Sequence, residues 1–316
     1  MKAIQIEEFG GPEALRYRDV PDPEPADGEV VVEVARAGVN FADTHAIRDD
    51  YLARQSLPLI PGGEIAGRTA DGRRVAALLQ RGGYAERVAV PAAALVPIPD
   101  GVSDEQAAAL LLQGLTARSI LRISARLERG ESVVVGAAAG GTGSLAVQLA
   151  KRLGAGRVIA LASSEEKRAL ARRLGADAAV DSRAEDLAAQ ILDANGGEPV
   201  DVVLEMAGGA TFDACLEALA PFGRLVTFGL ATRQPNSVRN ADLMRTSRAV
   251  VGFWLVHLFR RPDELRSGIA ELLGAVAAGE LEVVIGGTYP LSAARRALED
   301  IAARRTEGKL LLDPAA

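Results

Sequence analysis

The sequence predicts an α/β protein in which a doubly wound parallel sheet is inserted into a second domain rich in β-strands. Residues 117–253 alternate between apolar strands and helices, which is typical of a parallel sheet with crossover helices. Residues 1–116 instead hold short valine-rich runs between turns, and residues 254–316 add helices and a final strand. We therefore expect domain limits at 1–116, 117–253 and 254–316, with the first and last segments forming one domain.

The first segment predicts an irregular, mainly antiparallel β-domain. Residues 30–34, 74–77 and 87–90 are short runs rich in valine and alanine, and valine favours strands. Asp27-Gly28 and Asp71-Gly72 are turn signals between such runs.

The central segment shows the strand–helix rhythm most clearly. A valine run at 133–135 precedes a predicted helix in which Leu145, Leu149 and Leu153 recur every four residues. Gly154 stands where that helix should end. Further apolar runs and helical patterns follow in alternation, so we expect several strand–helix units in one sheet.

The last segment begins with an amphipathic helix that carries Leu265, Ile269 and Leu272 on one stripe. A second helix is expected around residues 293–304, before a terminal strand at 309–312. That strand needs a sheet to join, and we expect the N-terminal β-domain to provide it.

Composition excludes several classes of protein. The 316 residues include 36 Lys and Arg against 42 Asp and Glu, and no basic cluster stands apart from acids. We therefore expect no nucleic-acid partner and no membrane partner. The single cysteine, Cys215, excludes an internal disulfide and a four-cysteine zinc site. Residues 1–8 lack the apolar run of a signal peptide, so a cytoplasmic location is expected.

The most informative motif is the glycine-rich turn between the strand at 133–135 and the following helix. It contains Ala139, Gly140, Gly141, Thr142 and Gly143, with alanine at the first glycine position of G-x-G-x-x-G. Small residues let the backbone approach a pyrophosphate, and the free N–H groups of the helix favour that anion. The alternative is a tight turn without a ligand, but the surrounding strands and helices favour dinucleotide binding.

The end of the next strand predicts NADP(H) as the dinucleotide. A site for NAD places Asp or Glu about 20 residues beyond the glycines, to bind the ribose 2′-hydroxyl. Here Ser163 and Ser164 occupy that region and Lys167 follows. These side chains can bind a 2′-phosphate, with Arg168 or Arg183 sharing the role. The alternative is that Lys167 belongs to a solvated helix face.

Motifs along the whole chain resemble one family. The segments EFGGPE (8–13), AGVNFAD (37–43), PGGEIAG (61–67), AAGGTG (138–143), GGATF (208–212) and TEGK (306–309) are similar to those of the zinc-independent quinone oxidoreductases. These enzymes belong to the medium-chain dehydrogenase/reductase superfamily. The resemblance implies a GroES-like catalytic domain interrupted by a Rossmann domain, a substrate cleft and a homodimer.

The expected site contains no metal. Zinc-dependent relatives carry a cysteine near the position of Asn40 and a histidine where Gly63 stands, and neither residue here binds zinc. His45 and His257 are the only histidines, and we assign no role to His45. Glu64 is expected to be a salt-bridged structural acid.

Two residues are candidates for catalysis through the resemblance. Asn40 is expected to donate its amide hydrogen to a carbonyl oxygen, and the alternative is an amide that caps its own loop. Tyr51 is expected to stack on the substrate ring or to donate its hydroxyl, and the alternative is an ordinary surface tyrosine.

Further residues are expected at the cofactor. Phe228 and Gly229 follow a strand and should let backbone lie close to the nicotinamide. Thr116 is expected to bind the cofactor, the alternative being a threonine at a helix start. Lys309 is expected near the cofactor, the alternative being a lysine on a strand edge. Arg183 replaces the tyrosine that relatives often carry near adenine.

The sequence thus predicts an NADPH-dependent reductase of a small molecule, either a quinone or an α,β-unsaturated carbonyl compound. Two alternatives stay open at this point. One is an enoyl reductase or another biosynthetic reductase with a dedicated substrate. The other, from a different class, is a catalytically silent protein that binds NADPH.

Overall fold

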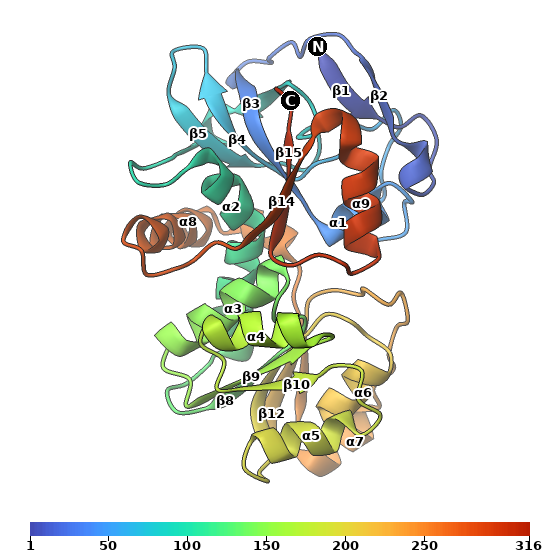
Figure 1. The fold of residues 1–316 in the computed structure, drawn as a ribbon, viewed down its shortest axis with the longest axis vertical. Coiled ribbons are helices and arrows are strands. Elements are labelled where there is room, and N and C mark those ends of the chain that lie inside the picture. The colour runs from blue at the N-terminus through green and yellow to red at the C-terminus, as the bar shows by residue number, and fades with distance from the viewer. The chain divides into compact units, whose positions relative to one another are not determined.

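The computed structural model describes residues 1–316 and divides them into two compact units (Figure 1). The first unit contains Met1–Leu112 and Ile269–Ala316, and the second contains Gln113–Gly268. The second unit is therefore inserted into the sequence of the first, as predicted.

The limits of the units fall inside two helices. These are α2 (Asp104–Ser119) and α8 (Pro262–Ala277). The predicted domain limits at residues 116 and 253 mark a change in sequence pattern, whereas the units are defined by compactness. The predicted limits therefore stay predictions.

The second unit is built on a six-stranded sheet, which confirms the doubly wound prediction. All neighbouring strands are parallel, in the order β10-β9-β8-β11-β12-β13. The strands are β8 (Ser132–Val135), β9 (Arg157–Ala162), β10 (Ala178–Asp181), β11 (Val200–Glu205), β12 (Leu219–Thr227) and β13 (Ala249–Gly252). The strand order reverses between β8 and β11, and such a switch point is where α/β sheets bind ligands.

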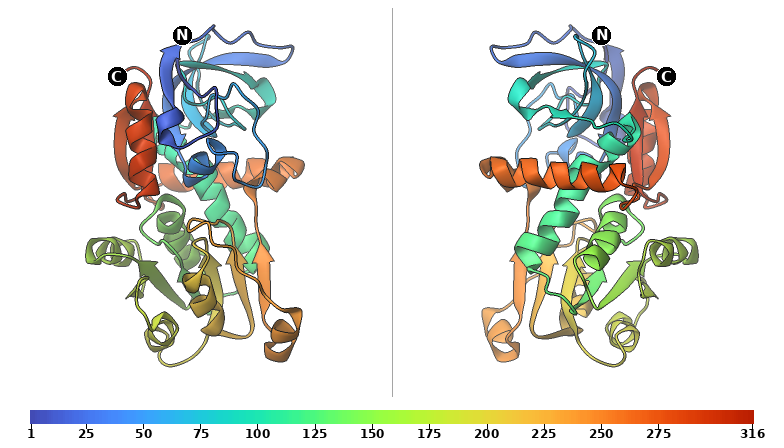
Figure 2. Two further views of the ribbon diagram at one scale, coloured as in Figure 1. Left: turned by 90° about the vertical axis from the view of Figure 1, so that its right-hand side faces the viewer. Right: turned by 90° about the vertical axis from the view of Figure 1, so that its left-hand side faces the viewer.

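Helices lie on both sides of these strands (Figure 2). The helices that lie wholly within this unit are α3 (Gly141–Arg152), α4 (Glu165–Arg173), α5 (Leu187–Ala194), α6 (Ala210–Glu217), α7 (Asn240–Thr246), the π-helix η3 (Ile120–Ala125) and the 3₁₀-helix η4 (Leu255–Arg260). Gly154 and Gly175 follow α3 and α4 with φ of 90° and 112°. Those left-handed conformations favour glycine, and Gly154 ends α3 where the sequence predicts.

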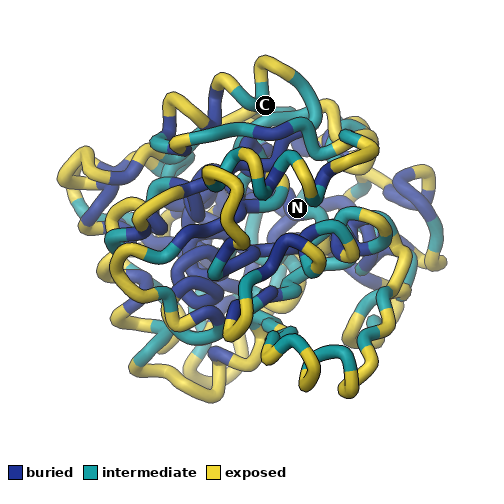
Figure 3. The backbone as a smooth tube through the Cα atoms, turned by 90° about the horizontal axis from the view of Figure 1, so that it is seen from below, coloured by how far each residue is buried: buried dark blue, intermediate teal, exposed yellow.

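The core of the second unit lies between the helices and the sheet. Val134, Ile159 and Val203 from three neighbouring strands are fully buried, and Phe212 and Cys215 of α6 pack against the same cluster. Burial raises the pKa of the Cys215 thiol. In Figure 3 the buried segments lie inside and the exposed turns outside.

The first unit contains a seven-stranded sheet that is mostly antiparallel. Its order is β14-β15-β3-β4-β5-β7, and β6 also pairs with β3. The strands are β3 (Glu29–Val39), β4 (Glu64–Thr69), β5 (Arg74–Leu78), β6 (Arg87–Pro91), β7 (Val96–Pro97), β14 (Ile285–Pro290) and β15 (Lys309–Asp313), beside a separate hairpin of β1 (Lys2–Gln5) and β2 (Arg16–Asp19). The terminal strand β15 pairs with β3, so the N-terminal β-domain does receive it, as predicted.

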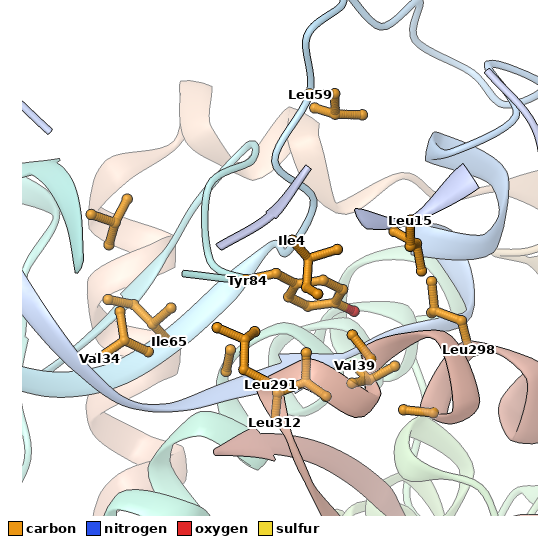
Figure 4. Packing of buried hydrophobic residues seen from close by; sticks show 14 of the residues in the cluster. Ile4, Leu15, Val34, Val39, Leu59, Ile65, Tyr84, Leu291, Leu298 and Leu312 are labelled. Carbon is orange, nitrogen blue, oxygen red and sulfur yellow. The ribbon is translucent and has the colours of Figure 1, made fainter. Parts of the chain in front are cut away.

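Short helices complete the first unit. They are η1 (Pro12–Ala14), α1 (Phe41–Ala46), η2 (Ala92–Ala94), η5 (Leu291–Ala293) and α9 (Ala294–Ala302). Leu298 of α9 packs with Val39, Tyr84 and Ile4 in the core shown in Figure 4. Full burial of such an aliphatic side chain contributes about 1.5–3 kcal/mol.

None of the helices combines the length and the apolar composition that crossing a bilayer requires.

Candidate functional site

The predicted cofactor residues of the second unit follow the ends of neighbouring parallel strands. The glycine-rich turn follows β8, Ser163 and Ser164 follow β9, Arg183 follows β10, and Gly229 follows β12. Since all these strands run in one direction, their carboxyl ends form one edge of the sheet. We call this the carboxyl edge. It brings together groups that are separated in the sequence.

The turn after β8 leads directly into the N-terminus of α3. Gly140 is the N-cap residue, and the N–H of Ser144 donates to its carbonyl oxygen at 2.8 Å. The first turn of α3 carries no acidic residue. Its N–H groups point out of the helix end, and the helix dipole makes this end favourable for an anion.

Two glycines of the turn are required by packing inside the fold. A Cβ atom at Gly141 would overlap the side chain of Gln113, and one at Gly143 would overlap the backbone of Ala137. Gly140 has more room, because a Cβ there would lie 3.2 Å from the Ala137 carbonyl oxygen. A glycine at 140 is thus the one that the fold alone explains least, and a close approach by a ligand explains it better. Gln113 was missed by sequence reasoning, because only the helix packing brings it to the turn.

The end of β9 carries hydroxyl groups and a lysine. Ser164 is the N-cap residue of α4, and its hydroxyl accepts from the Lys167 N–H at 3.4 Å. Glu165, the next acid in the sequence, is engaged with Arg168 and Arg172 at 3.0 and 2.8 Å. Residues 162–164 offer no carboxylate to a ribose 2′-hydroxyl.

The two arginines proposed for the 2′-phosphate differ in their surroundings. The Arg168 guanidinium lies 3.2 Å from an Asp181 carboxylate oxygen and donates to the Ala162 carbonyl at 3.3 Å. Arg183 is exposed, and only its backbone N–H is held, by Asp181 at 3.0 Å. Arg183 is therefore better placed than Arg168 to meet a phosphate or a base.

Phe228 and Gly229 lie where β12 ends. The Phe228 N–H donates to the Glu205 carbonyl at 3.1 Å, which holds this end of β12 against β11. A Cβ atom at Gly229 would lie 3.1 Å from that of Met206.

Thr116 is buried within α2, which begins at Asp104. The alternative of a helix-start threonine is therefore wrong, because the helix begins at acids three turns earlier. The predicted contact with the cofactor stays a prediction.

Glu205 is a buried acid that sequence reasoning missed. It ends β11 beside the switch point, and one carboxylate oxygen accepts from the N–H groups of Ala207 and Gly208 at 2.6 and 2.9 Å. Burial raises its pKa, although these two hydrogen bonds oppose the shift. Glu205 thus shapes the loop that follows β11.

A buried polar network lies in the first unit. Lys309 pairs with Glu64, and both side chains are at most 1 % exposed. The Lys309 ammonium also donates to Asn40 Oδ1 at 2.7 Å, and Asn40 Nδ2 donates to Glu64 at 2.9 Å. The second Glu64 oxygen accepts from the Leu112 N–H at 2.7 Å. Glu64 is a salt-bridged structural acid, as predicted.

The network changes the interpretation of Asn40 and Lys309. Lys309 begins β15, which has β14 on one side and β3 on the other, so the alternative of a strand-edge lysine is wrong. Asn40 is the N-cap residue of α1, and its amide is also fixed by the charges of Lys309 and Glu64. Their predicted contacts with substrate and cofactor stay predictions.

Asp43 and Tyr84 extend this network. The Tyr84 hydroxyl and the Asn40 N–H both donate to Asp43 Oδ2, at 2.7 and 2.8 Å. Burial raises the pKa of Asp43 to about 6, against the opposing effect of these hydrogen bonds. Burial beside Asp43 raises the pKa of Tyr84. Sequence reasoning missed both residues, although Asp three positions after an N-cap Asn is a signal of capping.

Tyr51 lies against His45. The two rings are stacked, with centroids 4.9 Å apart and planes 24° from parallel. Burial raises the pKa of the Tyr51 hydroxyl. The ring is thus packed on one neighbour and partly exposed, and its catalytic role stays a prediction.

Comparisons with known proteins agree with this architecture. A family model described as "Alcohol dehydrogenase GroES-like domain" matches residues 26–100, and one described as "Zinc-binding dehydrogenase" matches residues 141–274. A quinone oxidoreductase of Pseudomonas aeruginosa is 37 % identical, and the match covers 99 % of each chain. This chain belongs to the zinc-independent quinone oxidoreductase-like family of medium-chain dehydrogenases/reductases.

Solved structures of the family superpose over the whole chain. The Escherichia coli quinone oxidoreductase complexed with NADPH gives a TM-score of 0.94 at 32 % identity, covering 99 % of this chain and 100 % of that one. The Thermus thermophilus quinone oxidoreductase, also described in complex with NADPH, gives 0.90 at 40 % identity with the same coverage. The Rossmann and GroES-like folds predicted from the resemblance are thereby confirmed.

The donor set of this family member does not fit zinc, despite the description of the second family model. No three His, Cys, Asp or Glu side chains gather as metal ligands. Cys215 is buried in the core of the second unit, and His45 and His257 belong to different units. A tetrahedral site of nitrogen and sulfur ligands cannot be assembled from them.

Proposed function

We propose that this protein is an NADPH-dependent oxidoreductase that reduces a quinone or an α,β-unsaturated carbonyl compound. The observation that carries the proposal is the carboxyl edge. A helix N-terminus without a first-turn acid follows β8, and hydroxyl groups with a lysine, instead of a carboxylate, follow β9. Relatives described with NADPH support the same coenzyme.

The residues at the carboxyl edge fit NADP(H). The backbone of Gly140–Gly143 would hold the pyrophosphate, since glycine at 140 has no side chain to keep a ligand away from the backbone. Ser163, Ser164 and Lys167 would hold the 2′-phosphate, and exposed Arg183 would lie over the adenine or join that phosphate. Bound there, the coenzyme supplies a hydride.

The nicotinamide end would be held by Thr116, Phe228 and Gly229. Gly229 lacks a side chain at the end of β12, so the backbone can lie close to a ligand there. Lys309 is proposed for the same cofactor region, with its ammonium already engaged by Glu64 and Asn40.

On the acceptor side, the chain would bind and orient a carbonyl oxygen. Lys309 and Glu64 fix the two ends of the Asn40 amide, and a preorganised donor stabilises developing negative charge better than a mobile one. Tyr51 offers an aromatic surface for a flat conjugated acceptor. Delocalised acceptor anions need less stabilisation than an alkoxide, which suits a site without a metal.

The test uses the purified full-length protein with NADPH or NADH and a panel of acceptors: 1,4-benzoquinone, 9,10-phenanthrenequinone and 2-cyclohexen-1-one. We expect NADPH to be oxidised with at least one acceptor and NADH far more slowly. Chromatography of the products distinguishes a hydroquinone from a saturated ketone. Tight NADPH binding by calorimetry without turnover of any acceptor would instead support a silent binding protein.

A homodimer and a cytoplasmic location also belong to the proposal. Light scattering coupled to size-exclusion chromatography should give twice the mass of one chain. A single-chain mass at micromolar concentration would contradict the dimer.

A further inference from the structure

His45 is a buried titratable residue that the proposed function has not used. It belongs to α1 and is 2 % exposed. The ring centroids of Phe41 and His45 lie 5.8 Å apart with their planes at 59°, and the Tyr51 ring is stacked on the imidazole. The imidazole therefore lies among aromatic rings, which are suitable contacts for a flat conjugated molecule.

One ring nitrogen of His45 is fixed by a carboxylate. Nδ1 lies 2.7 Å from Asp50 Oδ1. A carboxylate at Nδ1 favours a proton on that nitrogen, so Nε2 is the ring nitrogen that is left to engage a ligand.

The loop that carries Asp50 and Tyr51 is held by its own contacts. Asp49 has φ of 53°, and its carboxylate accepts from the Gln55 N–H at 2.7 Å and from Arg54 at 2.9 Å. The side chains that contact His45 are thus presented by an ordered turn.

The other nitrogen, Nε2, is buried and has no hydrogen-bond partner. Buried polar atoms are nearly always satisfied, so an exception on a titratable ring requires an explanation. A ligand oxygen that reaches Nε2 would satisfy it. Because Nε2 is covered, a side chain around the imidazole must move before the acceptor can reach it.

We propose that His45 Nε2 donates a hydrogen bond, and then its proton, to the carbonyl oxygen of the acceptor, with Asp50 as the positioning residue. This inference rests on the proposed function and names its proton donor. For an enone, the β-carbon gains the hydride from NADPH, the C=C and C=O electrons shift, and the oxygen takes the proton from Nε2. The enol then becomes the saturated ketone, and neutral His45 regains a proton from water.

The first test observes the imidazole without any coenzyme, so no turnover occurs. The chain has two histidines, so protein labelled with ¹⁵N-histidine gives two ring spin systems, and His257→Asn assigns them. On addition of 2-cyclohexen-1-one, we expect the His45 Nε2 resonance to move while Nδ1 stays protonated and His257 stays unchanged. A His45 resonance that does not move at the highest soluble concentration would overturn the proposal.

Asp50 is tested by the same spectra. Asp50→Asn should remove the preference for the Nδ1 proton and weaken the response to the ligand, and Asp50→Glu should restore both. An unchanged preference in Asp50→Asn would show that Asp50 does not position the ring.

The second test is kinetic. His45→Gln should lower kcat about 100-fold, the order expected for a lost proton donor, and leave the NADPH KM unchanged. His257→Gln is the matched control and should keep wild-type kcat. Wild-type kcat in His45→Gln would overturn the proposal, and a variant that does not fold leaves the decision to the spectra. If the wild-type protein reduces no acceptor, the proposed function fails, and the spectra alone still decide whether His45 binds the carbonyl compound.

Discussion

The two units hold their polar groups in opposite ways. At the glycine-rich turn of the second unit, the expected pyrophosphate contacts are backbone N–H groups from one short stretch, Gly140–Gly143. In the first unit, the network consists of charged and amide side chains from Asn40, Glu64 and Lys309. The first arrangement is local in the sequence, and the second joins distant positions.

This difference determines how each centre can be broken. A backbone cradle fails when a side chain adds volume to it. A buried charge network fails when one partner is removed, because the remaining charge is left in a low-dielectric interior. Substitutions that add side-chain volume should therefore disrupt the glycine-rich turn of the second unit. Substitutions that remove a charged group should disrupt the network of the first unit.

The largest effect is expected for Lys309→Met. It leaves the Glu64 carboxylate buried without its cation, which should lower the free energy of unfolding by about 3–5 kcal/mol. Chemical denaturation measures the loss. Lys2→Met, which breaks the exposed pair with Asp19, is the control and should change stability little. A double variant with Glu64→Gln should recover part of the loss, and a single variant as stable as the wild type would contradict the importance of the pair.

The next effect is a pH dependence from Asp43. Because burial raises its folded pKa to about 6 from 3.8, its contribution to stability is full below pH 3.8 and is lost as the pH rises through 6. Asp43→Asn removes this loss, so the stability of the variant relative to wild type should improve between pH 4 and pH 8, by at most about 3 kcal/mol. Denaturation at both pH values measures it. Asp19→Asn should show no such trend over this range, because Lys2 lowers the pKa of Asp19 and its contribution to stability therefore changes only below about pH 4. A relative stability of Asp43→Asn that is independent of pH would contradict the raised pKa.

Alanine variants at Gly143 and Gly140 distinguish a glycine that is required for packing of the fold from one that is required for the approach of a ligand. Gly143→Ala places a methyl group against the Ala137 backbone and should cost about 2 kcal/mol of stability. Gly140→Ala, with more room, should keep the fold and weaken NADPH binding instead. Thermal unfolding and calorimetry measure the two properties. Equal losses of stability would mean that Gly140 is also required by packing alone.

The smallest effect concerns coenzyme choice. Lys167→Ala should raise the NADPH Kd about tenfold, as expected for one charge-assisted hydrogen bond, and leave the NADH Kd unchanged. Calorimetry with both coenzymes measures it. Lys151→Ala, which breaks a pair with Asp177 in the same unit, is the control. Equal weakening of both coenzymes would remove Lys167 from the 2′-phosphate site.

The glycine-rich turn of the second unit was predictable from the sequence, whereas the Glu64–Lys309 network of the first unit was not. The valine run, the glycines and the helix periodicity occupy consecutive residues, so the strand–turn–helix unit at 132–152 follows from pattern alone. The pairing of Glu64 with Lys309 spans 245 positions and depends on β15 joining β3. The sequence predicted that the terminal strand joins the N-terminal β-domain, but the pattern shows neither its partner strand nor the side chains that this pairing brings face to face.

Small errors have equally physical causes. Thr116 was weighed as a threonine at a helix start, yet it lies inside α2 and is buried. Lys309 was weighed as an edge residue because a lysine in a strand usually avoids burial. Lys309 can be buried because the Glu64 carboxylate lies beside its ammonium group, and the sequence pattern does not show this pairing.

The single thiol in the core of the second unit can serve as a chemical probe for the opening of that unit. Cys215 is 1 % exposed, so a thiol reagent should reach it only when the second unit opens, and its labelling rate should report that opening. The first unit contains no sulfhydryl and contributes no signal, which makes unfolding of the inserted unit measurable in the intact chain.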